Sequence, residues 1–481
     1  MTLALLLAWV LPWAAGTALF CVLSTPRAAG WVPAALGHGL VLGMLLAAAA
    51  TDIFARDDTE HALWRGALPL ALFALACGAF AWRRTLRVAA VARPAGPSAE
   101  KKWKVALCIA ALATLALRAA IAAREIQLRP TFPWDAWDAW AVKAKTWYLL
   151  DRYVPYASML DWFRSAGDAH SGVGWSYPTA PPWLQVWFAS AAGGWIEPVA
   201  NLPWLVLWIG LLLLHYGQWR ALGLDRVRAI GFVYVLGSLP LITVHVALAG
   251  YADLWLGTLL GAALLAWQRW RERRDRGQLL LAAACALLLP WIKLEGAVWL
   301  LLLAGWAAYH ALPALRRRWI FGAVLLLALA AAAFGCLALP LFGLGWVDIE
   351  LTRITVPYIG MLNVGWHGSA LGGVFAALFA QPNWHLLWWL APALIAWRWR
   401  ELQRQPALRA LGGFLLLGFG FLVFLFLFTD AARWAESYTA VNRLIMHLVP
   451  ATVTLLALLC RQLPVRRRHR APPSAALPAR A

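Results

Sequence analysis

Apolar runs of about 16 to 23 residues recur along the whole chain, and they restrict its fold more than any other feature. About 20 residues of α-helix are needed to cross the hydrocarbon core of a bilayer. The runs do not alternate between apolar and polar residues as a membrane β-barrel does. Of the 481 residues, 63% are hydrophobic and 13% are charged, which is too apolar for the surface of a soluble domain. We therefore predict an all-α fold, a polytopic transmembrane helical bundle.

The apolar runs predict about 13 spans. One further run, 181–196, is too short to count with them and is interpreted as a half-buried or re-entrant segment. The first run lacks the basic n-region of a signal peptide, so we expect it to be retained as a helix. The expected spans are 3–23, 30–50, 66–82, 104–122, 200–217, 229–249, 254–270, 278–292, 297–312, 319–341, 384–398, 410–428 and 444–460.

Charged residues divide between two sets of loops when the connections are numbered alternately. One set holds most of the 42 Lys and Arg residues, in short segments such as QRWRERRDRG, and is therefore assigned to the cytoplasm. The other set carries most of the 22 Asp and Glu residues, which places the N-terminus outside and the C-terminus inside. The formal net charge of +20 is then a topology signal and not a sign of nucleic-acid binding, and the basic loops also suit anionic membrane lipids.

The six cysteines lie within or at the edges of apolar runs. Isolated membrane cysteines behave as small hydrophobic residues. They indicate neither a disulfide framework nor a metal site.

The first long outer loop, 123–180, contains the stretch FPWDAWDAWAVKAKTWYLL at residues 132–150. The simplest interpretation is an amphipathic interfacial helix, with Asp135 as its N-cap and Asp138 at the third helical position. Lys143 and Lys145 would then extend toward water. In this interpretation one side of the helix presents Trp134, Trp137 and Trp140 to the membrane interface.

Other polar and aromatic groups fall on the same predicted face. An acid in a turn, such as Asp253, avoids the cost of about 3 kcal/mol that it would have at the centre of a span. Each group has an ordinary explanation as a helix cap, a solvated charge or a snorkelling side chain, but these explanations do not account for their convergence on one face. The segments are Tyr177-Pro178, Tyr251-Ala252-Asp253-Leu254, Lys293-Leu294-Glu295-Gly296 and Asn442-Arg443.

Taken in order, these segments resemble the GT-C superfamily of polytopic glycosyltransferases. The similarity is to a bacterial family 39-like branch, related to protein O-mannosyltransferases and to the lipid A aminoarabinose transferase. It spans about residues 124–450, and no single motif in it is specific. It rests on Trp134-Asp135-Ala136-Trp137 with Trp140, on Lys143-Ala144-Lys145, on the four outer segments above, and on Pro450 after Arg443.

The resemblance implies a bacterial inner-membrane enzyme with a periplasmic active site. Its donor would be a polyprenyl-phosphate sugar, and its acceptor a hydroxyl of a lipid, glycan or protein. We expect residues 1–103 to form a three-span extension with a basic cytoplasmic loop, 104–460 the GT-C-like catalytic module with interfacial helices in its first loop, and 461–481 a disordered basic tail.

An inverting displacement needs one carboxylate opposite the leaving group. The resemblance gives this role of general base to Asp135, with Asp138 as second choice. We expect Lys293 and Arg443 to bind the donor phosphate, as a point charge and a planar fork. Glu295 would not share a helical face with Lys293, two residues away, and is expected to orient another group. The expected substrate-binding residues are Tyr177, Tyr251, Asp253, Glu295, Trp137 and Trp140.

No His, Cys and Asp cluster has metal-ligand spacing, so no cofactor is expected, although two outer acids would suit a divalent ion. In the family, the motif His-Pro-Pro-Leu often closes the first loop. This sequence departs from that pattern, because it has Tyr177-Pro178 followed by Pro181-Pro182 at the same place. No large C-terminal soluble domain follows, which favours transfer of a single sugar over transfer of a block.

Three other functions stay open from the residues alone. A transporter or lipid-linked sugar flippase would show ionisable groups at mid-bilayer, broken helices and inverted repeats. A polysaccharide polymerase or ligase would rely on Arg and His in its large outer loop, without this acid in the first loop. A purely structural membrane protein is the third alternative.

Overall fold

The computed structural model describes residues 2–24, 29–86, 101–335, 337–340, 345–357 and 359–461. Its described residues are predominantly helical, and seven helices are long and apolar enough to cross a membrane, or eight if one bent pair counts as a span. The predicted bundle of membrane-compatible helices is thus confirmed, whereas the number of 13 spans stays a prediction. The expected tail 461–481 lies, after Arg461, outside the described residues.

Long helices dominate the order of elements. The helices are α1 (Leu3–Leu23), α2 (Trp31–Phe54), α3 (Ala62–Leu86), α4 (Lys102–Leu128), the π-helix η1 (Ala136–Ala141), α5 (Val142–Leu149), α6 (Met159–Arg164), α7 (Ala180–Ala192), α8 (Glu197–Asn201), α9 (Pro203–Ala221), α10 (Arg226–Ser238), α11 (Pro240–Ala247), α12 (Asp253–Arg273), α13 (Arg276–Ile292), α14 (Glu295–Ala311), α15 (Ala314–Ala333), α16 (Ala370–Phe375), the π-helix η2 (Ala376–Ala380), α17 (Leu387–Trp397), α18 (Trp399–Arg404), α19 (Pro406–Leu427), α20 (Ala432–Glu436) and α21 (Val441–Leu459). The strands are β1 (Tyr156–Ala157), β2 (His170–Ser171), β3 (Leu337–Pro340), β4 (Trp346–Ile349), β5 (Arg353–Val356) and β6 (Gly360–Asn363).

Glycines set the close packing of the first helices. A Cβ atom added to Gly16 of α1 would lie 2.3 Å from the carbonyl oxygen of Gly39 in α2. One added to Gly37 of α2 would lie 2.3 Å from the backbone nitrogen of Leu214 in α9. Small residues allow such close approach of helices within a bilayer, where dispersion and not the hydrophobic effect drives helix association. The three-span extension predicted at 1–103 therefore shares a core with the segment 104–460.

Two predicted spans are not the single continuous helices that the apolar pattern suggests. The run 229–249 is broken between α10 and α11, which meet at a bend of 59° with Pro240 at the start of α11. The run 319–341 stops at Ala333, because Gly335 takes a φ of +64° and strand β3 follows. The re-entrant candidate is α7, a helix of 13 residues in which all residues but Ala192 are buried, so it is more than half-buried.

The described residues are predominantly helical, but the prediction of an all-α fold does not hold for the four strands β3 to β6. Strands β3 to β6 form an antiparallel sheet in sequential order, in which Ala338 pairs with Asp348 and Ile354 with Leu362. β-Branched and aromatic residues favour this conformation, and β4 (WVDI) and β5 (RITV) are rich in them. This local signal was obscured by the apolar run that precedes it.

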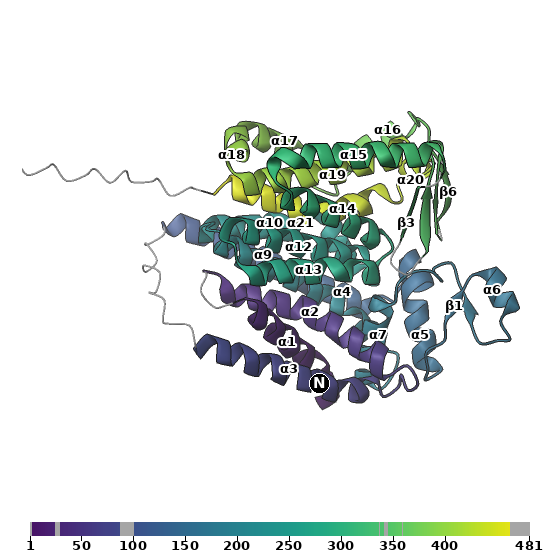
Figure 1. Ribbon diagram of the computed structural model, residues 1–481. Coiled ribbons are helices and arrows are strands. Elements are labelled where there is room, and N and C mark those ends of the chain that lie inside the picture. Colours follow the sequence, from purple (N-terminus) through teal and green to yellow (C-terminus); the bar gives the residue numbers. More distant parts are fainter. Residues whose placement is uncertain are drawn as a thin grey trace, which may run out of the picture.

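The loops assigned to the outer face meet at one end of the bundle. Figure 1 shows the sheet β3–β6, α5, α6 and α20 at that end, with α18 at the opposite end. The segments 123–180, 342–383 and 429–443 supply these elements except β3, which comes from the end of the predicted span 319–341. We refer to this end as the predicted outer end.

Candidate functional site

A buried carboxylate organises the predicted outer end. Asp253, the first residue of α12, has no exposed surface. Its Oδ1 accepts a hydrogen bond from Lys293 Nζ at 2.7 Å. Its Oδ2 accepts a hydrogen bond from Arg443 Nε at 3.0 Å and lies 2.9 Å from a terminal guanidinium nitrogen of the same residue, as an ion pair. Two cations from α21 and the α13–α14 turn are thereby held on the two oxygens of one group, and we name these three residues the ion cluster.

Each cation of the ion cluster has a second, more exposed carboxylate partner. Lys293 Nζ lies 2.8 Å from Glu295 Oε1, and Arg443 lies 2.5 Å from Asp135 Oδ2. The side chains of Asp135 and Glu295 are both 28% exposed, whereas that of Asp253 is 0% exposed. Burial opposes the charge of Lys293, but Asp253 and Glu295 outweigh it and raise the pKa of the ammonium group above its usual range.

The pairing of Lys293 with Glu295 corrects the expectation that they would lie apart. That expectation assumed a helix through both residues. Lys293 instead has extended backbone, with φ −156° and ψ 153°, at the end of α13, and Glu295 starts α14. The second oxygen, Glu295 Oε2, is buried and has no hydrogen-bond partner among the described residues. An unpaired buried acceptor of this kind would suit a water molecule or a ligand hydroxyl.

His447 is part of this site, although the sequence analysis did not select it. Its Nδ1 lies 3.1 Å from Trp299 Nε1, and its Nε2 lies 3.1 Å from Asp253 Oδ1. Because an indole N–H can only donate, Nδ1 accepts, and the proton of the ring then lies on Nε2 and is donated to Asp253. The signal was the spacing Arg443-x-x-x-His447, which places both side chains on one face of α21.

Glycines in the predicted motifs bring these segments together. Gly250 has φ +108°, and a Cβ added there would lie 2.6 Å from Ala136 Cβ, so the turn before Asp253 rests directly on η1. At Gly296 an added Cβ would lie 2.0 Å from the carbonyl oxygen of Leu289, so only glycine fits this turn. The closeness of α12 and α21 likewise depends on Gly257, whose added Cβ would lie 3.1 Å from the carbonyl oxygen of Met446.

Asp135 does not cap a helix, contrary to the simplest interpretation of the opening stretch. It stands before η1 with helical backbone angles, and its side chain makes no capping hydrogen bond. The carboxylate turns to Arg443 instead. Asp138 lies within η1, is partly exposed, and makes no ion pair within the described part of the chain. π-Helical turns are frequent at functional sites.

The tryptophans of the opening stretch do not share one side. Trp134 and Trp137 are exposed and contact each other edge to face, with ring centroids 5.3 Å apart. Trp140 is fully buried and packs on Tyr177 at 4.7 Å. The wider π-helical turn separates residues that an α-helix would align. Trp137 and Trp140, both expected to bind substrate, therefore differ in access to solvent.

Tyr251 and Tyr177 flank the ion cluster. The Arg443 guanidinium carbon lies 4.6 Å from the centroid of the Tyr251 ring, a cation–π contact. Trp204 Nε1 donates to the carbonyl oxygen of Tyr251 at 2.7 Å. Burial raises the pKa of both phenols, Tyr177 and Tyr251, so both stay protonated at neutral pH and are able to donate.

Lys143 is buried, so it is not the snorkelling residue expected at the end of an interfacial helix. Its Nζ donates to the carbonyl oxygens of Trp175 at 3.2 Å and Tyr177 at 2.7 Å. These bonds join α5 to the loop that precedes α7. Burial lowers the pKa of the Lys143 ammonium group to about 7.

Because the Lys143 ammonium group is buried, we expect the free energy of unfolding to depend on pH, and the variant Lys143→Met to lose this dependence. An unfolded lysine has a pKa near 10.4, so between about pH 7 and pH 10 the unfolded chain binds a proton that the folded chain does not. Stability then rises with pH, by at most about 1.4 kcal/mol per unit. Thermal unfolding in detergent at pH 6 to 9 should show this rise in the wild type and in the exposed control Lys145→Met. Parallel curves for the wild type and Lys143→Met would contradict it.

Among the described residues, no group of three or more His, Cys, Asp or Glu side chains has the arrangement of a metal site. The described cysteines are free thiols. The ion cluster pairs its one carboxylate, Asp253, with two basic side chains, which is the arrangement of an ion-pair network.

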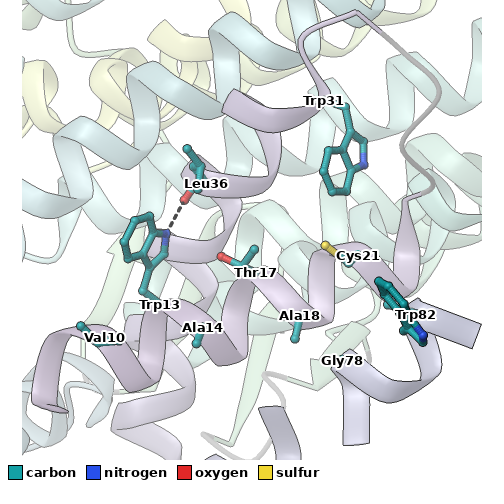
Figure 2. Close-up of a pocket in the computed structure, with 11 residues that line it drawn as sticks. Val10, Trp13, Ala14, Thr17, Ala18, Cys21, Trp31, Leu36, Gly78 and Trp82 are labelled. Atoms are coloured by element: carbon teal, nitrogen blue, oxygen red, sulfur yellow. Dashed lines mark hydrogen bonds between the residues drawn. The ribbon is translucent and has the colours of Figure 1, made fainter. Parts of the chain in front are cut away.

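An apolar cavity of about 520 Å³ lies apart from these residues, between α1, α2 and α3. Figure 2 shows its lining, where Trp13 Nε1 donates to the carbonyl oxygen of Leu36 at 3.3 Å. None of the predicted site residues lines this cavity.

Comparison of the chain with protein-family models, with curated proteins and with solved structures finds no match to any of them. The resemblance to GT-C glycosyltransferases therefore stays a prediction from the residues.

Proposed function

We propose that this protein is a GT-C-type membrane glycosyltransferase that moves a single sugar from a polyprenyl-phosphate donor to an acceptor hydroxyl at the periplasmic face, with inversion. The observation that carries the proposal is the ion cluster. Lys293 and Arg443, the two cations expected to bind the donor phosphate, contact the two oxygens of one buried carboxylate, and Asp135 lies on the second of these cations.

Burial divides the carboxylates of the site into two kinds. Asp253 is enclosed and receives hydrogen bonds from Lys293, Arg443 and His447, so it anchors the cations and does not reach a sugar. This role replaces the sugar-binding role expected from the sequence. Asp135 and Glu295 lie on the exposed sides of the cations, where a phosphate competes with them directly.

Phosphate binding would thus free the base. In the resting site the Asp135 carboxylate neutralises Arg443. A donor phosphate on the Arg443 guanidinium releases Asp135 to accept a proton from the acceptor hydroxyl. The hydroxyl oxygen then bonds to the anomeric carbon, the bond from that carbon to the phosphate oxygen breaks, and the phosphate leaves with the electron pair, stabilised by both cations.

Substitution Arg443→Lys tests the cationic part of this mechanism. Lysine keeps the charge but loses the planar fork that bridges Asp135 and Asp253. We expect the release of labelled sugar from a polyprenyl-phosphate donor to fall by about 100-fold or more, the usual effect of losing a preorganised donor to a developing anion. Arg433→Lys, at an exposed outer arginine that stacks on Trp434, is the matched control. Equal loss in both variants would contradict the assignment.

A second candidate, a transporter or flippase for a lipid-linked sugar, is favoured by one observation. The pair α10 and α11 is bent by 59°, as the broken helices of transporters are. The two candidates differ in what becomes of the donor. A transferase breaks the bond between sugar and phosphate, and a flippase moves the intact donor between leaflets.

A further inference from the structure

A basic hollow of about 390 Å³ lies at the opposite end of the bundle from the ion cluster. Its lining residues come from the ends of α12, α18 and α21 and the start of α19. They are Arg271, Glu272, Arg274, Arg404, Gln405, Pro406, Ala407 and Arg461. Arg443 of the ion cluster lies in the first turn of α21, and Arg461 of the hollow lies just beyond the end of the same helix, which is long and apolar enough to cross a membrane. The 19 residues of α21 rise by about 28 Å, close to the ~30 Å thickness of the hydrocarbon core, which would place the hollow at the other membrane interface.

Arg461 and Glu272 line the hollow with largely buried side chains that are held by hydrogen bonds. The side chain of Arg461 is 11% exposed and donates at 2.7 Å both to Glu272 Oε2 and to the carbonyl oxygen of Leu222, and at 2.8 Å to Gln405 Oε1. The Nε of Arg461 is buried without a hydrogen-bond partner among the described residues. Glu272 also accepts from Gln268 at 2.9 Å. The one acidic group of the lining is therefore engaged with Arg461.

The other arginines leave a positive rim. Arg271 and Arg274 stack on the rings of Trp267 and Trp270, at 5.4 and 5.7 Å. Arg274 and Arg404 are exposed, and neither makes an ion pair within the residues that the structure describes. The C-terminal ends of α12 and α18 each carry a partial negative charge that opposes the binding of an anion. The N-terminal end of α19, which also faces this region, carries a partial positive charge, and the guanidinium groups carry full positive charges. The net potential of the hollow is therefore positive.

We propose that this hollow binds the phosphate of an anionic phospholipid headgroup at the face that carries the basic loops. Guanidinium groups match phosphate oxygens in paired hydrogen bonds, and basic pockets between membrane helices are suited to such headgroups. A soluble phosphate compound offers the same chemistry. The position at the membrane interface favours the lipid.

The experiment is a titration of the purified full-length protein in a zwitterionic detergent, followed by its thermal unfolding midpoint. Short-chain phosphatidylglycerol, short-chain phosphatidylcholine and glycerol phosphate are added separately. We expect saturable stabilisation by phosphatidylglycerol alone. The double variant Arg274→Gln/Arg404→Gln should weaken its apparent affinity by roughly 25-fold, about five-fold for each arginine.

The matched control is Arg276→Gln/Arg400→Gln, which removes the same charge from exposed arginines that do not line the hollow. We expect it to change the affinity by about two-fold at most. An equal loss in both double variants would overturn the proposal, because general charge would then explain the binding. Stabilisation by phosphatidylcholine, or by glycerol phosphate as strongly as by the anionic lipid, would overturn the lipid assignment.

Discussion

Asp135→Asn is expected to lower sugar transfer by about 100- to 10,000-fold, the usual contribution of a positioned general base. The asparagine amide keeps the shape of the side chain but cannot accept the acceptor proton. It also loses the ion pair with Arg443, which leaves that cation more open to phosphate. Donor binding should therefore persist while transfer fails, and the two are measured with a labelled polyprenyl-phosphate sugar.

Asp138→Asn is the matched control, because it makes the same chemical change three residues away. Asp138 makes no ion pair with the residues that the structure describes, and we expect transfer within about three-fold of the wild type. Loss of transfer in Asp138→Asn alone would exchange the roles of the two acids. Full activity in both variants would show that the stretch 132–150 has only a structural role at the predicted outer end.

Asp253→Asn is expected to destabilise the fold by about 3 kcal/mol or more. Removal of one partner from a buried ion pair leaves the other charge uncompensated. Here one carboxylate neutralises both Lys293 and Arg443, and it also receives the His447 N–H. The measurement is the thermal unfolding of the purified variant in detergent, together with its monodisperse fraction.

Asp225→Asn controls for the loss of an acid at a helix start. Asp225 caps α10 and pairs with Arg228 at a side-chain exposure of 43%. Asparagine caps a helix about as well as aspartate, and an exposed pair contributes about 1 kcal/mol at most. A stability of Asp253→Asn equal to that of Asp225→Asn would show that the ion cluster does not hold the outer end together.

The sequence was sufficient for features that composition and charge determine. Apolar runs long enough to cross a bilayer predicted the helical bundle, and the alternating charge of the loops predicted which segments meet at one end. Because Tyr251, Asp253, Lys293 and Arg443 all fell in loops or span ends of that end, their convergence was predictable. The close contacts at positions 250 and 296 leave no room for a Cβ atom, which explains why these motifs contain a glycine there.

Other features depend on contacts distant in sequence and were not predictable from local patterns. The π-helix η1 turns Asp135 to Arg443, more than 300 positions away, and separates Trp137 from Trp140. The burial of Lys143 depends on the carbonyl groups of the loop at 175–177. The sheet β3–β6 was hidden because the apolar run before it continues to Pro340 without an obvious break.

The central claim, transfer of sugar at the outer face, is tested most directly by following both halves of a labelled donor. Sealed membrane vesicles of each orientation, from cells that express the protein, receive a doubly labelled polyprenyl-phosphate sugar. We expect the sugar label to leave the lipid fraction only where the donor has access to the predicted outer face, and only with the protein present. Movement of the intact donor between leaflets, with the sugar still on its phosphate, would contradict the transferase and establish the flippase instead.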